Sequence, residues 1–257
     1  MVPYCNLCQS NHVQLHLKLN DSHSIYTCKN CGNGFTDPPP QTIAYTEEDF
    51  HEQFGFTTIA DLPKQWRNSV LKQIKFIKKY IHPNANILEI GCGQGLFLTQ
   101  LEKEGYQVYG IEPSVKASAV ARSKGLNVKT GYYPAQNFDG VKFDLIIMAQ
   151  VLEHVEAPLE LLQQISSLNK NAYLLLVQTN FKGLVPQKQK QNWYAWVPDQ
   201  HFTHFTAKGI RFLTQTINLK TIEIEYSTLE HNNYWLSKCA SILPGTGDQI
   251  HAMIKLF

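Results

Sequence analysis

Four cysteines near the start of the chain have the spacing of metal ligands. Cys5 and Cys8 form one C-x2-C pair, Cys28 and Cys31 form a second, and nineteen residues separate the pairs. Two such turns bring four thiolates onto one tetrahedral zinc ion, and a site closed in this way keeps no position open for a substrate. We therefore predict a structural zinc ribbon over residues 1–40. Two disulfides, or a ribbon that no longer binds metal, are the alternatives that the spacing leaves open.

Three histidines, His12, His16 and His23, lie between the two cysteine pairs. We expect strand or loop positions for them, because four thiolates already complete the coordination shell of the metal. The ribbon carries two lysines against two aspartates and is therefore neutral. A module that grips nucleic-acid phosphates is expected to be basic, so nucleic acid is the weaker prediction for its partner.

A glycine-rich turn is the second group of residues with a chemical use. Residues 87–113 read ILEIGCGQGLFLTQLEKEGYQVYGIEP, in which an apolar run leads into Gly91, Gly93 and Gly95. Glycines at these places let the backbone approach a ligand where a Cβ atom would collide with it. Leu96 stands where the dinucleotide fingerprint G-x-G-x-x-G has its third glycine, so we do not expect NAD here.

The third group consists of residues that can accept a proton. QVLEHV at 150–155 follows an apolar run directly, and NWYAWVPDQHFTHFT at 192–206 combines aromatic residues with two histidines. A neutral imidazole is available near pH 7 and can remove a proton from a bound substrate. A packing role for the histidine in 150–155, and a packed loop for 192–206, are the alternatives. The candidates are Glu153, His154, His201 and His204.

The elements that must position these groups alternate along the chain. Apolar runs and helical patterns follow one another from residue 86 to residue 178, which predicts a parallel sheet covered by helices on both faces. After a helix near 206–217, two strands over 220–227 and 232–241 are joined by so few residues that we expect an antiparallel pair. Strands are predicted near 86–90, 107–112, 127–130, 143–149 and 172–178, with helices near 94–104, 114–124 and 158–168.

A linker and an amphipathic helix separate the ribbon from this alternating region. The proline run TDPPPQ at 36–41 ends the ribbon, and residues 62–82 carry six basic residues and no acid. Their apolar residues recur at helical spacing, so the basic residues form the solvated face of a helix, with a membrane or nucleic-acid surface as the alternative. The apolar stripe is Trp66, Val70, Ile74, Ile77 and Ile81. We predict three parts: 1–40 ribbon, 41–82 linker and helix, and 83–257 the sheet domain.

Composition limits the class of protein. The chain has 257 residues, 43% of them hydrophobic, which suits one sizeable core with a small added module. Its longest apolar runs fall far below the roughly 18 residues of a membrane span, and its first residues lack the pattern of an export signal. We expect a cytoplasmic protein without a membrane span. The net charge of +2 gives little overall attraction to nucleic acid.

Taken together, the motifs resemble one enzyme family. Glu89 to Gly95, the acid Glu112, FDLIIMAQVLEHV and the closing strand pair resemble the class I S-adenosylmethionine-dependent methyltransferases over about residues 60–240. CNLC…CKNCGNGFTDPPP before this fold is similar to a bacterial subgroup with zinc ribbons that acts on small molecules, sugar C-methyltransferases among them. VLEHV is similar to the matching segment of quinone-biosynthesis O-methyltransferases. The resemblance implies a doubly wound, mostly parallel, seven-stranded Rossmann-like α/β sheet.

The resemblance also implies a cofactor site for S-adenosylmethionine. Glu112 would accept hydrogen bonds from the ribose hydroxyls, and Glu89 would favour the ammonium group. The usual acid beside the adenine is absent, so Ala135 and Gln136 become the candidates there, and the Cys92 thiol is expected to pack and not to react. The cofactor-binding candidates are Glu89, Gly91, Cys92, Gly93, Gly95, Glu112, Pro113, Ala135, Gln136 and Gln150.

Three classes of function remain open. The first is a methyltransferase for a small polar acceptor, a sugar or another hydroxylated metabolite, with His154 as the base. In it, the ribbon and residues 180–205 cover the acceptor, with Trp193, Tyr194 and Trp196 as a wall. The second is an rRNA or tRNA base methyltransferase whose ribbon reads the substrate, and the third is a non-catalytic S-adenosylmethionine-binding scaffold. The neutral ribbon favours the first class, and the glycine loop with both acids disfavours the third.

Overall fold

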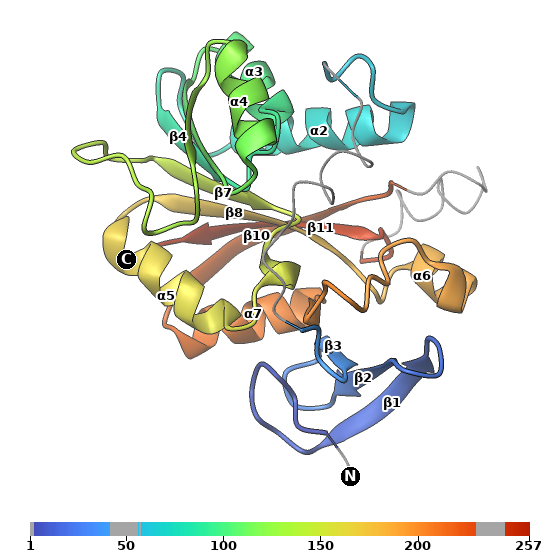
Figure 1. Cartoon of the computed structure of the whole chain (residues 1–257). Coiled ribbons are helices and arrows are strands. Elements are labelled where there is room, and N and C mark those ends of the chain that lie inside the picture. The colour runs from blue at the N-terminus through green and yellow to red at the C-terminus, as the bar shows by residue number, and fades with distance from the viewer. Residues whose placement is uncertain (1–2, 42–55, 57, 230–244) are drawn as a thin grey trace. The chain divides into compact units, whose positions relative to one another are not determined.

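Figure 1 shows the computed structural model of the chain, which describes residues 3–41, 56, 58–229 and 245–257. The chain divides into two compact units. The ribbon unit comprises residues 1–43, 150–164 and 176–254, and the glycine-loop unit comprises residues 44–149, 165–175 and 255–257. The three-part division predicted from the sequence, with borders at residues 40 and 82, stays a prediction.

The larger of the two sheets has seven strands in the order β10-β11-β8-β7-β4-β5-β6. Strand β4 pairs in parallel with both β5 and β7, and β5 pairs in parallel with β6. The predicted α/β fold with a mostly parallel, seven-stranded sheet is therefore confirmed. The strands are β4 (Asn86–Ile90), β5 (Gln107–Glu112), β6 (Asn127–Thr130), β7 (Leu145–Ala149), β8 (Tyr173–Thr179), β10 (Lys220–Ser227) and β11 (Gln249–Lys255).

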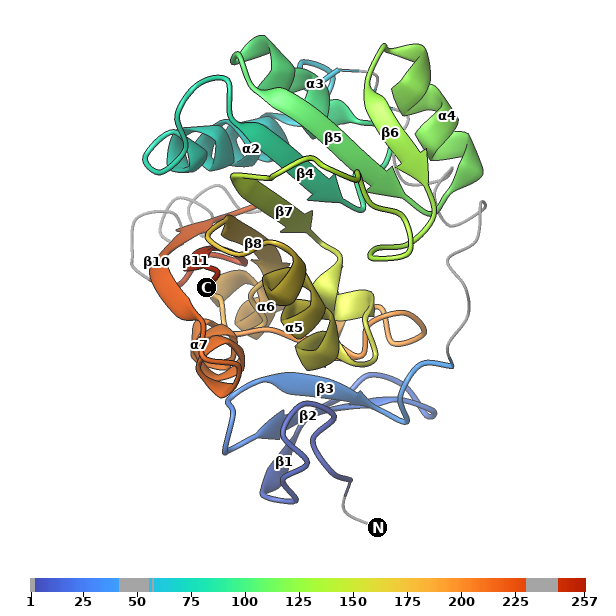
Figure 2. The same ribbon diagram turned by 90° about the vertical axis from the view of Figure 1, so that its left-hand side faces the viewer.

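In the glycine-loop unit, the ends of the strands define one edge of the sheet. Ile90, the last residue of β4, lies opposite Ile111 of β5 and Met148 of β7. Because the strands run in parallel, their carboxyl ends meet at the same edge, where open α/β sheets bind their ligands. Figure 2 shows α3 (Leu96–Lys103) against β5 and α4 (Val115–Ser123) against β6, close to the helices predicted there.

A glycine in β5 allows this close packing. A Cβ atom on Gly110 would lie 2.6 Å from Sγ of Cys92 and 2.8 Å from Cδ1 of Leu98. Any larger residue at this position would push α3 and the loop before it away from the strand, because a packed interior has no room to take up the extra volume.

The predicted amphipathic helix is α2 (Lys64–Ile77), which ends earlier than residue 82. Ile74 and Ile77 of the predicted stripe are buried in it, and Ile81 is buried just beyond its end. Trp66 and Val70 are only partly buried, because other residues of the helix form much of its buried face. Those other buried residues are Ser69, Gln73 and Phe76.

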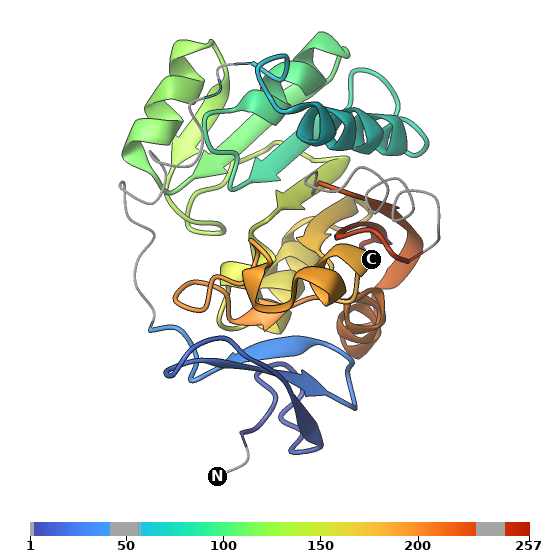
Figure 3. The ribbon, with the colours of Figure 1, turned by 90° about the vertical axis from the view of Figure 1, so that its right-hand side faces the viewer.

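The ribbon unit contains a second, antiparallel sheet. Three of its strands, β1 (Val13–Lys18), β2 (Ser24–Cys28) and β3 (Gly34–Asp37), come from the ribbon itself, and the fourth is β9 (Thr203–His204). Strand β3 pairs with β9 through Gly34 opposite His204 and Phe35 opposite Thr203. Figure 3 shows this orange segment running along the blue ribbon strands. The segment that carries the predicted histidines is therefore part of the ribbon sheet.

An apolar cluster fills the space between the ribbon and residues 181–196. It includes Ile25 of β2 and two tryptophans from the segment that follows α6 (Leu184–Gln189) and the short helix η2 (Lys190–Asn192). Burial of aromatic faces is the main energetic gain of such a cluster. Its buried members are Ile25, Phe181, Val185, Trp193, Ala195 and Trp196.

The remaining elements are two helices and the last strand of the described chain. The predicted helices near 158–168 and 206–217 are α5 (Pro158–Leu168) and α7 (Ala207–Thr216). The strand predicted over 232–241 lies outside the described residues, and the neighbour of β10 in the sheet is β11, for which no strand was predicted. Among the described residues, no helix has the length and apolar character to span a membrane.

Candidate functional site

The glycine loop follows β4 and has a backbone that other residues adopt with strain. The φ angles are 75° at Gly91, 53° at Gly93 and 73° at Gly95, all in the left-handed region. The Gly91 N–H donates to the Ile111 carbonyl at 2.8 Å, which ties the loop to the end of β5. A Cβ atom on Gly95 would lie only 2.3 Å from Cδ1 of Leu126. The loop therefore keeps its backbone open at the carboxyl edge of the sheet.

Glu112 closes the other side of this edge at the end of β5. Its side chain is buried, and the carboxylate accepts hydrogen bonds from the N–H groups of Gly93, at 2.8 Å, and Ser114, at 2.9 Å. These contacts fix the carboxylate beside the glycine loop. A carboxylate offers about four acceptor positions, so the group suits a ligand with two neighbouring hydroxyls.

Glu89 is the second buried acid of the glycine-loop unit. It is 4% exposed, and its Oε2 atom has no hydrogen-bond partner. Burial raises the pKa of Glu89 to about 8, and the negative charge of Glu112 adds to the rise. A buried carboxylate oxygen without a partner is costly, and a cationic group beside it would remove that cost. This observation fits the ammonium group of the predicted cofactor.

The other predicted cofactor residues differ in burial and in their contacts. Cys92 is buried over Gly110, and burial raises the pKa of its thiol, which suits a packing role. Pro113 is partly buried after Glu112, and Ala135 is exposed. Gln136 lies over Gly131, where an added Cβ atom would come within 2.6 Å of its Cγ. In the ribbon unit, the Gln150 side-chain amide donates to the Val177 carbonyl at 3.3 Å.

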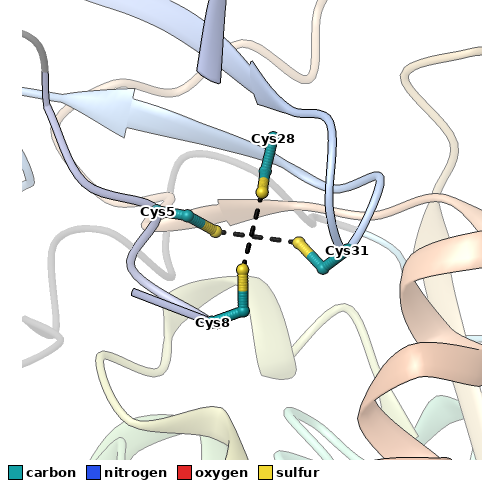
Figure 4. A group of neighbouring side chains, drawn as sticks. All are labelled: Cys5, Cys8, Cys28 and Cys31. Atoms are coloured by element: carbon teal, nitrogen blue, oxygen red, sulfur yellow. Dashed lines mark hydrogen bonds between the residues drawn. The ribbon is translucent and has the colours of Figure 1, made fainter. Parts of the chain in front are cut away.

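The four ribbon cysteines lie together as predicted. Figure 4 shows their Sγ atoms pointing toward one common point. The Sγ atoms of Cys5 and Cys31 are 3.7 Å apart and those of Cys8 and Cys28 are 3.5 Å apart, and all four thiols are free. Zn–S bonds of about 2.3 Å in a tetrahedron would set the sulfurs about 3.8 Å apart. The geometry therefore fits a metal and is too wide for disulfides.

The chemistry of the cysteines agrees with this geometry. A hydrogen bond from the Cys31 thiol lowers the pKa of Cys5 to about 5, which favours the thiolate that a metal needs. The three ribbon histidines stand outside the cluster of possible ligands in the described chain. The His16 ring lies 5.3 Å from the Phe181 ring, and Nε2 of His23 lies 3.8 Å from a carboxylate oxygen of Asp199.

Hydrogen bonds fasten the cysteine turns to residues 202–206. The Asn6 amide donates to Oγ1 of Thr203 at 2.7 Å. On the other turn, the Thr206 N–H donates to Oδ1 of Asn33 at 3.0 Å, and the Thr206 hydroxyl donates to the Gly32 carbonyl at 3.1 Å. The ribbon and the histidine segment are thus one hydrogen-bonded structure.

Three of the four predicted proton acceptors come together in the ribbon unit. Glu153 and His154 lie on the short helix η1 (Leu152–His154), and His201 lies just before β9. The rings of His154 and His201 meet edge to face, with centroids 4.6 Å apart. The Phe202 N–H donates to the Glu153 carbonyl at 2.9 Å, which holds the two segments together. We call Glu153, His154 and His201 the histidine cluster.

Glu153 is the least solvated member of the histidine cluster. It is 1% exposed, and neither of its carboxylate oxygens has a hydrogen-bond partner. Burial raises the pKa of Glu153 to about 8. Gln178, on β8, is itself buried, and neither end of its amide has a hydrogen-bond partner.

Hydrogen bonds show which ring nitrogen carries the proton in His201 and His204. Nδ1–H of His201 donates to the Ala195 carbonyl at 3.1 Å. Oγ1 of Thr36 donates to the His201 carbonyl at 2.6 Å, so at 3.0 Å it accepts from Nε2–H of His204. Burial lowers the pKa of both imidazoles, that of His204 to about 3, and both are neutral near pH 7.

His204 is set apart from the histidine cluster. Its ring centroid lies 6.1 Å from that of His201, and its Nδ1 atom is buried without a partner. Sequence analysis missed Thr36 and Gln178. A lone amide in the apolar run AYLLLVQT was the available signal for Gln178. Thr36 gave no signal, because its partners lie more than 160 residues away.

The predicted aromatic wall is wrong for its two tryptophans. Trp193 is 2% exposed and Trp196 is 9% exposed, and both belong to the apolar cluster against Phe181. The indole N–H of Trp196 donates to the Lys190 carbonyl at 2.7 Å. Their faces pack in the protein interior, which leaves Tyr194, 45% exposed, as the one solvated aromatic residue of the three.

A family model described as a methyltransferase domain matches residues 61–224, well over half of the chain. The chain belongs to the methyltransferase domain family. Two curated relatives are ubiquinone biosynthesis O-methyltransferases. That of Coxiella burnetii is 29% identical over 147 residues, covering 48% of this chain and 62% of the relative. That of Glaesserella parasuis is 34% identical over 104 residues, covering 36% of this chain and 44% of the relative.

Solved structures share the methyltransferase fold. A SAM-dependent methyltransferase from Thermotoga maritima has a TM-score of 0.56 at 20% identity, over 74% of this chain and 90% of that one. Magnesium protoporphyrin IX methyltransferase from Synechocystis, with bound SAH, also has a TM-score of 0.56, at 16% identity, over 74% and 83% of the two chains. Identities this low show the fold alone. The chain spans about six tenths, or less, of its curated relatives.

Proposed function

We propose that this methyltransferase transfers a methyl group from S-adenosylmethionine to a hydroxyl of a small polar acceptor, a sugar or another hydroxylated metabolite. The observation that carries the proposal is the glycine loop with its two buried acids. Three left-handed glycines follow β4, Glu112 is fixed beside them, and Glu89 keeps one buried oxygen without a partner. Membership of the family supports the same reaction.

The residues of the loop would bind the donor. Gly91, Gly93 and Gly95 would allow close approach of the backbone to the donor. Glu112 would accept hydrogen bonds from the ribose hydroxyls, and Glu89 would pair with the ammonium group. When bound, S-adenosylmethionine supplies an electrophilic methyl group on a sulfonium, so the protein has to align the acceptor and remove its proton.

His154 would take the proton of the acceptor. The chain leaves β7 at Ala149 and enters η1 three residues later, so His154 closely follows the carboxyl end of a strand that pairs with β4. The edge-to-face contact with His201 orients its ring. A base of this kind contributes about two to four powers of ten to the rate.

The curated relatives support a hydroxyl as the acceptor group. Both are named as O-methyltransferases of ubiquinone biosynthesis, and the shared segments cover less than half of this chain. The neutral charge of the ribbon supports a small acceptor over nucleic acid, because phosphate binding calls for a basic surface.

The ribbon would bind one structural zinc ion through Cys5, Cys8, Cys28 and Cys31. The sulfur separations of 3.5 and 3.7 Å support this proposal. With four thiolates the site is closed, so it contributes folding energy and no chemistry.

The test is methyl transfer from S-adenosylmethionine carrying a deuterated methyl group. The acceptors are a panel of sugars, nucleotide sugars and phenols, with ribosomal RNA as the competing substrate. We expect the label on a small hydroxylated acceptor, and His154→Ala should lower turnover by about two to four powers of ten with nearly unchanged donor affinity. Label on RNA alone would overturn the proposed substrate class. Unchanged turnover in His154→Ala would remove the assigned base.

A further inference from the structure

We infer that the histidine cluster is a second metal site, in which Glu153, His154 and His201 hold one divalent transition-metal ion and leave coordination positions open. One ligand atom from each residue lies within 4.8 Å of the other two. Three ligands bound tetrahedrally at about 2.0–2.2 Å around one ion lie about 3.3–3.6 Å apart, so the side chains would close in by up to about 1.5 Å when an ion binds.

The carboxylate is the strongest observation for a bound cation. Both oxygens of Glu153 are buried without a hydrogen-bond partner, and the residue is 1% exposed. Native proteins seldom bury a carboxyl group in this condition, because each unpartnered oxygen loses its hydration. A cation between Glu153 and the two imidazoles would satisfy the carboxylate, and the neighbouring Gln178 amide would hold its second oxygen.

The imidazole ring of His201 is held in the way that is typical of a metal-binding histidine. Its Nδ1–H donates to the Ala195 carbonyl, which leaves Nε2 as the ring nitrogen with a lone pair. Metal-bound histidines almost always donate their other ring N–H to a carbonyl or a carboxylate in this way. Thr36 holds the main chain of the same residue by donating to its carbonyl.

The kind of ion follows from the donor set. Two imidazoles with one carboxylate suit zinc and the neighbouring divalent ions iron, cobalt, nickel and manganese, and they suit magnesium and calcium poorly. The ribbon offers four thiolates and is closed, whereas this site has three protein ligands. A fourth position, and further ones in a larger coordination sphere, remain for water or an oxygen of the acceptor.

A metal here would deepen the proposed function, on which this step rests. An acceptor hydroxyl placed on an open position has its pKa lowered and gives its proton to solvent water. Its oxygen then forms the new C–O bond, while the C–S bond of the donor breaks and its electron pair stays on sulfur. In this state His154 is a ligand, so the metal replaces it in activating the hydroxyl.

Metal content tests the inference without any acceptor. The full chain is stripped with a chelator, refilled with Zn²⁺, freed of excess ion and analysed for zinc per chain. We expect two ions in the wild type and in Glu156→Gln, whose exposed carboxylate lies two residues after His154. Glu153→Gln and His154→Gln should keep one ion and bind the second about 100-fold more weakly or worse, because loss of an outer-shell partner alone costs 10–100-fold.

A cobalt titration of the wild type gives a second measurement that needs no variant. Two equivalents should bind, one with the intense bands of thiolate ligation and one with weak bands alone. A single equivalent carrying thiolate bands, or two zinc ions in both variants, would overturn the inference. Full methyl transfer by protein that keeps only its ribbon metal would also overturn it and leave the proposed function standing. Two bound metals, with no methyl transfer to any hydroxylated acceptor, would support the metal site and overturn the proposed function.

Discussion

Two buried glutamates, one in each unit, share an uncommon condition. Glu89 and Glu153 are almost fully buried and keep carboxylate oxygens without hydrogen-bond partners. Burial raises the pKa of each to about 8, so both are largely protonated near pH 7 as long as no cation is bound. Each group therefore couples the binding of a positive charge to the release of a proton.

This coupling predicts how donor binding depends on pH. The ammonium group of S-adenosylmethionine should lower the pKa of Glu89 from about 8, so binding releases a proton and affinity rises from pH 6 to pH 8. Calorimetry in buffers of different ionisation enthalpy measures that proton. Glu89→Gln should bind more weakly and lose most of the slope, whereas Glu102→Gln, an exposed acid on α3, should keep it. An unchanged slope in Glu89→Gln would assign the proton to another group.

At the scale of elements, the two-residue strand β9 connects the ribbon to the histidines. Thr36 of β3 donates to the carbonyl of His201 and accepts from the ring of His204. The ribbon therefore positions the segment that carries His201 and His204.

Removing this hydroxyl should disturb the histidines. Thr36→Val loses two buried hydrogen bonds and leaves the His204 ring N–H unpaired, which costs about 1–3 kcal/mol of folding free energy. We expect turnover to fall about tenfold with donor affinity nearly unchanged. Thr27→Val is the matched control, since the Thr27 hydroxyl on β2 has no hydrogen-bond partner to lose. Equal behaviour of the two variants in denaturation and turnover would remove the positioning role of Thr36.

Loss of the ribbon metal should act through the same strand. Cys8→Ser removes one thiolate, loosens the turns that hold residues 202–206, and should lower turnover at least tenfold. The glycine loop, the proposed donor site, belongs to the other unit, so the affinity for S-adenosylmethionine should stay within about threefold. His12→Ala, at an exposed ribbon position outside the cysteine cluster, should keep both metal and turnover. A metal-free Cys8→Ser protein with full turnover would contradict this account.

The elements that the sequence predicted well are those with a local pattern. Strands β4 to β8 and their helices have apolar runs or helical spacing within ten or so residues, and they lie close to the predicted positions. Strand β11 was missed because Gln249 and His251 interrupt its apolar pattern. Both residues are buried and bonded to Ser227 of β10, a partner that only the folded sheet supplies.

At the scale of the whole molecule, the two units differ in what the sequence could predict. The glycine loop and its acids lie within 24 residues of one another, so the proposed donor site was visible as a motif. The ribbon unit is assembled from three separated parts of the chain. The pairing of Thr36 with His201 and the burial of Trp193 therefore depend on contacts that no local pattern encodes.

Donor binding tests the central claim most directly. Calorimetry on the full chain should detect binding of S-adenosylmethionine and its demethylated product and no binding of NAD, because Leu96 replaces the third glycine of the dinucleotide fingerprint. Glu112→Ala should weaken donor binding by about 1.5–3 kcal/mol, the cost of losing a charged hydrogen-bond acceptor, while Glu102→Ala should leave it unchanged. Tight binding of NAD, or equal donor affinity in wild type and Glu112→Ala, would contradict the account.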